Sequence, residues 1–154
     1  MRLSRLLLGA LALALLATPL FADRKLAGTF TKTASGLQIA ELKPGKGPGA
    51  AKGQTLGMLY RGWLYDTQKG RQGQQFDANL NRNKPLEFEL GAGRVIKGWD
   101  EGVAGMKKGG KRVLIIPPEL AYGDRGAGGV IPPGATLLFE VEVVSIQGEA
   151  KPIQ

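Results

Sequence analysis

Three segments of the chain hold the residues that could do chemistry. The first is Phe76-Asp77, the second is the run VIKGW from Val95 to Trp99, and the third is the run IPPELAYG from Ile116 to Gly123, followed shortly by IPP from Ile131 to Pro133. Aromatic and apolar side chains are prominent in these segments, and their order and spacing are too specific for a generic β protein.

The composition excludes the commonest catalytic side chains. The chain has no Cys and no His, so a thiolate nucleophile, a disulfide, a Ser-His-Asp triad and the usual zinc sites are all excluded. We therefore expect no metal and no cofactor. Whatever this protein does, it does without the commonest catalytic side chains.

Strands must position most of these residues. Apolar and polar residues alternate over 54–65 and again over 136–146, which predicts two long strands. In the second of them, Leu137, Phe139 and Val141 share one face. Shorter strands are predicted over 37–42, 85–90 and 111–116, with loops over 44–53 and 66–75.

One short helix completes the predicted fold. Ile96, Trp99, Val103 and Met106 recur at spacings of three, four and three residues, which predicts an apolar stripe on a helix of two or three turns, closed by Gly109-Gly110. Antiparallel strands with one helix over a sheet face predict an α+β domain.

In their order and spacing, the three motifs closely resemble those of the FKBP-type peptidyl-prolyl cis-trans isomerases, and the resemblance runs from about Ser35 to Gln147. It implies an antiparallel half-barrel of five or six strands wrapped around the short helix. It also implies acceleration of X–Pro bond rotation, with proline-containing polypeptides as substrates and macrolide inhibitors as further ligands.

The resemblance implies the site residue by residue. Asp77, Tyr122 and Phe139 match its catalytic positions. The positions that match its substrate pocket, with Trp99 as the floor, are Tyr60, Phe76, Val95, Ile96, Trp99 and Ile131. The backbone N–H of Ile96 and the hydroxyl of Tyr122 match groups that bond ligand carbonyls.

Plain structural roles are the alternative for each residue alone. A buried aromatic more often packs a core than lines a site, and an Asp at the end of a loop can be a turn or capping residue. For Asp77 we favour an orienting and electrostatic role, because the reaction moves no proton. Leu86, Arg94 and Ala127 depart from residues that many or well-studied members have, and the polar stretch over 66–75 predicts a longer surface hairpin.

The first 22 residues are typical of a secretory signal peptide. Arg2 and Arg5 precede the unbroken apolar run Leu6–Ala17, which at 12 residues falls short of the roughly 20 that span a bilayer. We expect cleavage after Ala22 and a periplasmic location, without stable membrane insertion after cleavage; an uncleaved anchor is the alternative. The expected segments are a signal peptide (1–22), a short polar leader (23–34), the isomerase domain (35–148) and a tail (149–154).

The chain is basic, with a formal net charge of +8. Its Lys and Arg are scattered and do not alternate with aromatics, so we expect no nucleic-acid partner. The leading hypothesis is an exported monomeric prolyl isomerase that helps envelope proteins to fold. The alternatives are a non-catalytic chaperone that grips apolar or Pro-containing segments, and a basic protein that binds anionic envelope surfaces.

Overall fold

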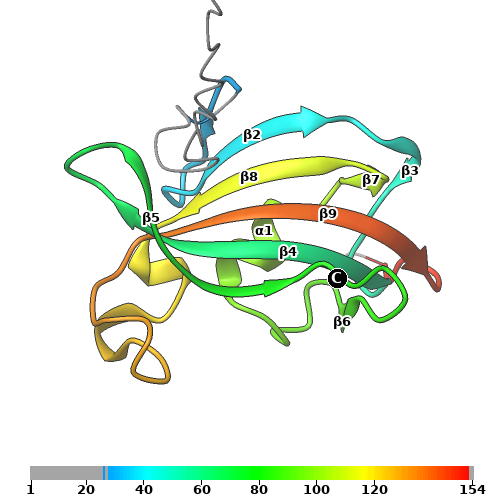
Figure 1. Ribbon diagram of the computed structural model, residues 1–154. Coiled ribbons are helices and arrows are strands. Elements are labelled where there is room, and N and C mark those ends of the chain that lie inside the picture. Colours follow the sequence, from blue (N-terminus) through cyan, green and yellow to red (C-terminus); the bar gives the residue numbers. More distant parts are fainter. Residues whose placement is uncertain (1–25, 27, 153–154) are drawn as a thin grey trace, which may run out of the picture.

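The computed structural model describes residues 26 and 28–152 and is shown in Figure 1. The signal peptide expected over 1–22 lies outside the described residues. In the part of the chain that is described, no helix is long and apolar enough to cross a membrane.

The elements follow one another as strands interrupted by a single α-helix. In chain order they are β1 Thr31–Lys32, β2 Gln38–Lys43, β3 Lys46–Gly49, β4 Thr55–Asp66, β5 Arg71–Asn79, β6 Leu86–Glu89, α1 Lys97–Gly102, β7 Lys107–Lys108, β8 Lys111–Ile116, the 3-10 turns η1 Pro118–Leu120 and η2 Gly123–Arg125, and β9 Leu137–Gln147. The predicted strands over 37–42, 54–65, 85–90, 111–116 and 136–146 correspond to β2, β4, β6, β8 and β9.

Seven strands form one antiparallel sheet in the order β1-β2-β8-β9-β4-β5, with β6 also paired to β4. Figure 1 shows the sheet curving around α1 while its edges stay apart, so it is a half-barrel and not a closed barrel. The expected α+β class is confirmed. The sheet exceeds five or six strands because the two residues of β1 add a short edge strand beside β2.

Alternation along the strands divides the apolar residues between the two faces of the sheet. We call the helix-side group the inner cluster; it consists of Leu37, Ala50, Leu56, Met58, Phe88, Leu90, Trp99, Val103, Met106, Leu114, Ile116, Ile131, Leu137, Phe139, Val141 and Val143. We call the opposite group the outer cluster; it consists of Ala40, Trp63, Val113, Ile115 and Leu138. The predicted face of Leu137, Phe139 and Val141 is therefore confirmed.

The helix is shorter than the spacing predicts. It covers only Lys97–Gly102, so the prediction of a helix that runs on to Gly109-Gly110 is wrong. Gly105 adopts the left-handed conformation, with a φ of 76°, which ends any helical continuation. Val103 and Met106 still reach the inner cluster, because a turn bonds the Met106 N–H to the Val103 carbonyl at 3.1 Å.

The predicted loop over 66–75 is largely a hairpin. β4 runs to Asp66 and β5 begins at Arg71, so only four residues form the turn. The side chain of Asp66 accepts hydrogen bonds from the backbone N–H groups of Gln68 and Lys69 and stabilises that turn. The sequence shows no alternation here because polar residues occupy both faces. The expected surface hairpin is present, whereas strand β5 was not predicted.

Two other segments contain more structure than the pattern indicates. The predicted loop over 44–53 includes β3, which pairs with β7 in a separate two-stranded sheet. The segment expected as a polar leader places Leu26 and Phe30 against the outer cluster, and β1 follows directly. Leu26 and Phe30 are two of the few apolar residues in the polar segment 23–34. The composition of that segment therefore predicts a leader and gives no sign that it packs on the sheet.

Candidate active site

A groove of about 240 Å³ opens on the inner face of the sheet, beside the segment that leads into α1. Ten residues line it: Tyr60, Phe76, Asp77, Leu86, Arg94, Val95, Ile96, Trp99, Tyr122 and Phe139. They come from β4, β5, β6, α1, β9 and the connecting segments, so the groove exists only once the sheet has wrapped around the helix.

Three aromatic rings form the base of the groove. The ring of Trp99 lies edge-to-face against Tyr60, at 5.2 Å between centroids, and against Phe139, at 5.3 Å. Such T-shaped pairs are favoured over stacked sandwiches and hold rings in fixed orientations. Trp99 and Phe139 are buried whereas Tyr60 is half-buried, so the base is rigid and its upper edge faces solvent.

Gly62 makes room for the rings on β4. A Cβ atom at this position would lie 2.6 Å from Phe139 and 2.8 Å from Phe76, distances that a real side chain does not reach. Because Gly62 has none, Phe76 and Phe139 can pack edge-to-face at 5.6 Å over the strand. The glycine within the alternating β4 pattern is therefore part of the site.

Asp77 and Tyr60 form the polar rim. The Tyr60 hydroxyl donates a 2.7 Å hydrogen bond to Oδ2 of Asp77, and the Ala78 N–H donates a 2.8 Å bond to Oδ1. Partial burial, followed by the bond to and the charge of Asp77, raises the pKa of Tyr60 from 10.0 to about 12. Tyr60 is therefore a neutral donor at ordinary pH, and the exposed Asp77 carboxylate is fixed by two donors.

The segment before α1 is held by Asp100. Its two carboxylate oxygens accept hydrogen bonds from the N–H groups of Gly91, at 2.8 Å, and Gly93, at 3.1 Å. The Ile96 carbonyl bonds the N–H of Trp99 and begins the helix. Asp100 thus positions the backbone that carries Val95 and Ile96, a role that sequence reasoning missed because nothing in the spacing connects it to the glycines.

Three donors around the groove have no acceptor among the described residues. They are the Ile96 N–H, the exposed Tyr122 hydroxyl and the buried Nε1–H of Trp99. The Trp99 donor is enclosed by protein, where an unpaired donor costs about 1–3 kcal/mol, so the Ile96 N–H and the Tyr122 hydroxyl are the two left for a ligand. The groove can accordingly hold an apolar ring and bond the carbonyl groups beside it.

Eight of the nine residues expected in the site line the groove. The ninth, Ile131, instead belongs to the inner cluster and is 6% exposed. Its backbone exchanges hydrogen bonds with Ala127 at 2.9 and 3.0 Å, which closes the loop and turns the side chain inward. Leu86 and Arg94, which the sequence singles out only as departures from the residues of other family members, also line the groove. They lie on separate segments, so no local pattern in the sequence places them in the site.

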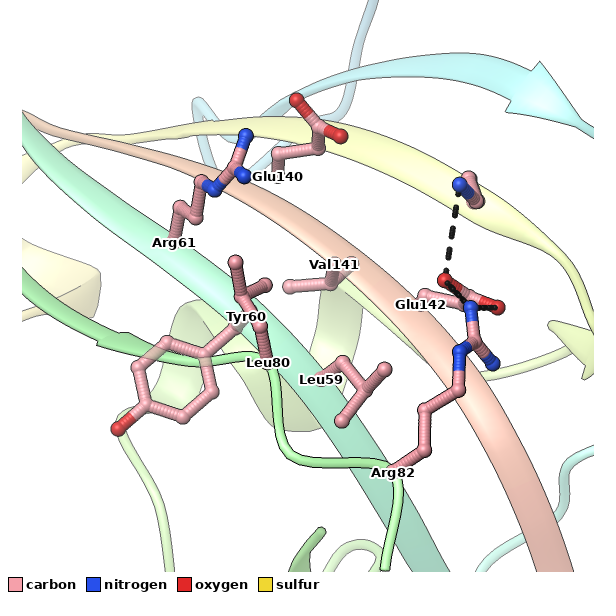
Figure 2. Close-up of a pocket in the computed structure, with 9 residues that line it drawn as sticks. Leu59, Tyr60, Arg61, Leu80, Arg82, Glu140, Val141 and Glu142 are labelled. Carbon is pink, nitrogen blue, oxygen red and sulfur yellow. Dashed lines mark hydrogen bonds and ion pairs between the residues drawn. The ribbon is translucent and has the colours of Figure 1, made fainter.

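A second groove lies on the opposite face of the sheet and differs in character. Figure 2 shows it, with the Tyr60 ring directed away from Arg61, its neighbour on β4. Glu142 pairs there with Arg82 at 2.8 Å and with Lys111 at 3.6 Å. These pairs compensate the charges of Arg82, Lys111 and Glu142. Among residues 26 and 28–152, no cluster of three acidic side chains could hold a metal ion in either groove.

Comparisons with known proteins agree on one family. A model of the FKBP-type peptidyl-prolyl cis-trans isomerases matches residues 47–144. An FK506-binding protein of Neisseria meningitidis serogroup B is 53% identical over 111 residues, which cover 72% of this chain and 96% of that protein. An FK506-binding protein 2B of Rhizopus delemar is 58% identical over 95 residues, 62% of this chain and 43% of that protein.

Solved structures share the architecture. The crystal structure of FkpA from Escherichia coli superposes with a TM-score of 0.66 at 39% identity over 77% of this chain, and the chain spans about half (51%) of that protein's length. The crystal structure of AtFKBP13 superposes with a TM-score of 0.65 at 46% identity, covering 76% of this chain and 98% of the other.

Proposed function

Because the chain belongs to the family of FKBP-type peptidyl-prolyl cis-trans isomerases, we propose that the inner groove binds an X–Pro segment of a folding polypeptide and accelerates rotation about its amide bond. The observation that supports this most directly is the apolar groove floored by aromatic rings, with the unpaired Ile96 N–H and Tyr122 hydroxyl at its edge. The proline ring would lie over Trp99.

The reaction needs no nucleophile. Rotation is slow because the amide loses its C–N resonance, at a cost of about 18–20 kcal/mol. The planar amide carries charge separation that water stabilises, and the twisted transition state carries less. A groove that replaces water with the rings of Trp99, Phe139 and Phe76 therefore raises the planar state relative to the twisted one. Each tenfold acceleration requires about 1.4 kcal/mol.

Polar groups at the edge would hold the substrate in the twisted geometry. We assign the Ile96 N–H and the Tyr122 hydroxyl to substrate carbonyls, since both lie at the groove without another acceptor among the described residues. Asp77 keeps Tyr60 oriented through the 2.7 Å bond and places negative charge beside the carbonyl carbon as the amide twists. None of these groups transfers a proton.

The test is relaxation of the cis isomer of an X–Pro peptide, followed with the protein that begins at Asp23, which contains every residue of both clusters. We expect acceleration by the unchanged protein and a fall in kcat/KM of about tenfold or more for Asp77→Asn, Tyr122→Phe and Phe139→Ala, because each lost transition-state interaction of 1.4 kcal/mol costs tenfold.

Glu149→Gln is the matched control for Asp77→Asn, because it also neutralises an exposed carboxylate but lies in the C-terminal tail, away from the groove. The control should leave kcat/KM unchanged. No acceleration by the unchanged protein would refute the proposal. If suppression of aggregation then survived the groove substitutions, the protein would be a non-catalytic chaperone instead.

The clients would be exported proteins. The pattern of Met1–Ala22, with two arginines before an apolar run, supports export to the periplasm. Mass spectrometry of the protein from the periplasmic fraction should give a chain that begins at Asp23. A chain that still begins at Met1 in the membrane fraction would indicate the uncleaved anchor.

The same groove supports two further expectations. Several relatives are named FK506-binding proteins, so we propose that macrolides of this kind compete with proline-containing substrates in the groove. Arg94 at the edge is a charged departure that would alter their affinity. We also propose a monomer in solution, which sedimentation can test.

A further inference from the structure

Four lysines meet at the end of the sheet away from the active-site groove. Lys43 ends β2, Lys46 begins β3, and Lys107 and Lys108 form β7; all four are exposed. We call this set the lysine end. Figure 1 shows β3 and β7 at the opposite end of the sheet from η1 and η2, near which Tyr122 lies.

The pairing of strands sets like charges against each other at this end. Lys46 is the direct cross-strand partner of Lys108, and Lys43 is that of Lys111. Directly opposite residues have Cβ atoms about 4.5–5.5 Å apart, and like charges there destabilise the pair. Lys111 is compensated by Glu142 at 3.6 Å, but no carboxylate of the described residues lies within 4.0 Å of the lysine end.

A glycine holds the strands in this unfavourable arrangement. Gly45 adopts the left-handed conformation, with a φ of 73°, and a Cβ atom there would lie 2.6 Å from the Gly110 nitrogen and 2.7 Å from the Lys107 carbonyl oxygen. Any other residue would push β3 away from β7. The backbone is therefore built so that the lysines stay close, although their mutual repulsion opposes it.

A groove of about 480 Å³ runs between three of these lysines, Lys43, Lys46 and Lys108. Its lining consists of Lys43, Pro44, Gly45, Lys46, Lys108 and Gly109. It contains three positive charges, no carboxylate and no aromatic ring. A ligand that fits this lining is anionic, and it needs neither stacking partners nor hydrogen-bond acceptors from the protein.

We propose that the lysine end docks the protein on an anionic lipid bilayer through the phosphates of the headgroups. A single-stranded nucleic acid is disfavoured because the lining lacks the aromatic platforms on which bases stack. An acidic segment of a bound client is disfavoured because the lysines lie at the opposite end from the active-site groove. Docked in this way, the protein keeps that groove directed away from the membrane and open to clients.

The experiment measures partition of the protein that begins at Asp23 onto vesicles of phosphatidylcholine with about 30 mol% phosphatidylglycerol. Each lysine near such a surface contributes about 1 kcal/mol, or roughly fivefold. Replacing all four (Lys43→Gln, Lys46→Gln, Lys107→Gln, Lys108→Gln) should therefore lower the partition coefficient at least 100-fold at low salt. Binding of the unchanged protein should also weaken as salt shortens the Debye length from about 30 Å to about 10 Å.

A control variant loses the same charge elsewhere. Lys32→Gln, Lys69→Gln, Lys84→Gln and Arg125→Gln remove four exposed basic side chains from scattered positions and should lower partition less than tenfold. The variant of the lysine end should keep its peptide isomerase rate. It should also melt at a higher temperature than the unchanged protein at low salt, because the facing charges are gone; this separates lost docking from lost folding.

Three results would overturn the proposal. Equal loss in both variants would mean that net charge alone causes binding. Equal partition of the unchanged protein onto neutral and anionic vesicles would mean that no such surface exists. Tighter binding to polyglutamate or to single-stranded DNA than to the anionic vesicles would assign the lysine end to a different class of partner. None of these results depends on whether the isomerase proposal holds.

Discussion

The two faces of the sheet bury the same kinds of residue but differ in how completely other parts of the chain cover them. Each face buries a tryptophan, Trp99 at 3% exposure on the inner side and Trp63 at 7% on the outer side. The outer face is covered by Leu26 and Phe30 from the N-terminal segment. The inner face is covered by a helix of only six residues, which leaves the rings of Tyr60 and Phe76 half-open.

Incomplete cover, and not aromatic content, distinguishes the inner face, where we propose the binding site. Apolar area that stays accessible can still be removed from water by a ligand, at about 25 cal/mol per Å². The inner face also keeps donors that lack acceptors among the described residues, whereas Arg82 and Lys111 in the outer groove pair with Glu142. The outer tryptophan is therefore expected to matter for stability alone.

The largest expected effect comes from truncating the two tryptophans. Trp99→Ala and Trp63→Ala should each lower the free energy of unfolding by about 3–5 kcal/mol, measured by urea denaturation. Only Trp99→Ala should lower kcat/KM per folded molecule, by tenfold or more. If either variant does not fold, Trp99→Phe and Trp63→Phe make the same comparison. An equal loss of activity in Trp99→Ala and Trp63→Ala would contradict the functional distinction between the two faces.

A smaller effect separates the two half-buried phenylalanines. Phe30→Ala should cost about 1.5–2.5 kcal/mol, roughly half the value for a fully buried ring, and leave the isomerase rate unchanged. Phe76→Ala should cost about the same stability but impair catalysis, because Phe76 packs on Phe139 at the groove. A fall in activity with Phe30→Ala would show that the cover of the outer face also shapes the site.

The smallest effect concerns the bond between Tyr60 and Asp77. Removing it by Tyr60→Phe should cost about 1 kcal/mol at pH 7. Because the folded pKa of Tyr60 is raised from 10.0 to about 12, the neutral form is favoured by folding; the stabilisation is complete below pH 10 and is lost as pH rises towards 12.

Urea denaturation at intervals between pH 9 and pH 12 tests that dependence. The unchanged protein should lose stability over this range, and Tyr60→Phe should lose less. Tyr65→Phe, which removes a phenol packed against the outer cluster, is the control and should behave like the unchanged protein. A Tyr60→Phe curve parallel to that of the unchanged protein would contradict the assignment of the raised pKa.

The sequence by itself determined the faces of the two long strands, the family motifs and eight of the ten residues that line the groove. Alternation with a period of two is a local property, so β4 and β9 could be recognised without a partner strand. The motifs are likewise contiguous. Strand β5 escaped recognition because polar residues and a glycine fill its first half, residues 71–75. The helix was overestimated because its spacing continues through a turn at Gly105.

Only the tertiary structure decided which distant residues meet. Tyr60 bonds Asp77 across two strands, Asp100 holds the glycines before α1, Phe30 packs against the outer cluster, and Lys46 faces Lys108. Each of these contacts depends on strand register or chain reversal, which join residues far apart in the chain and leave no local pattern. Sequence could therefore name the groove's residues, but their hydrogen bonds, the cover on the outer face and the opposing lysines follow from how the chain is folded.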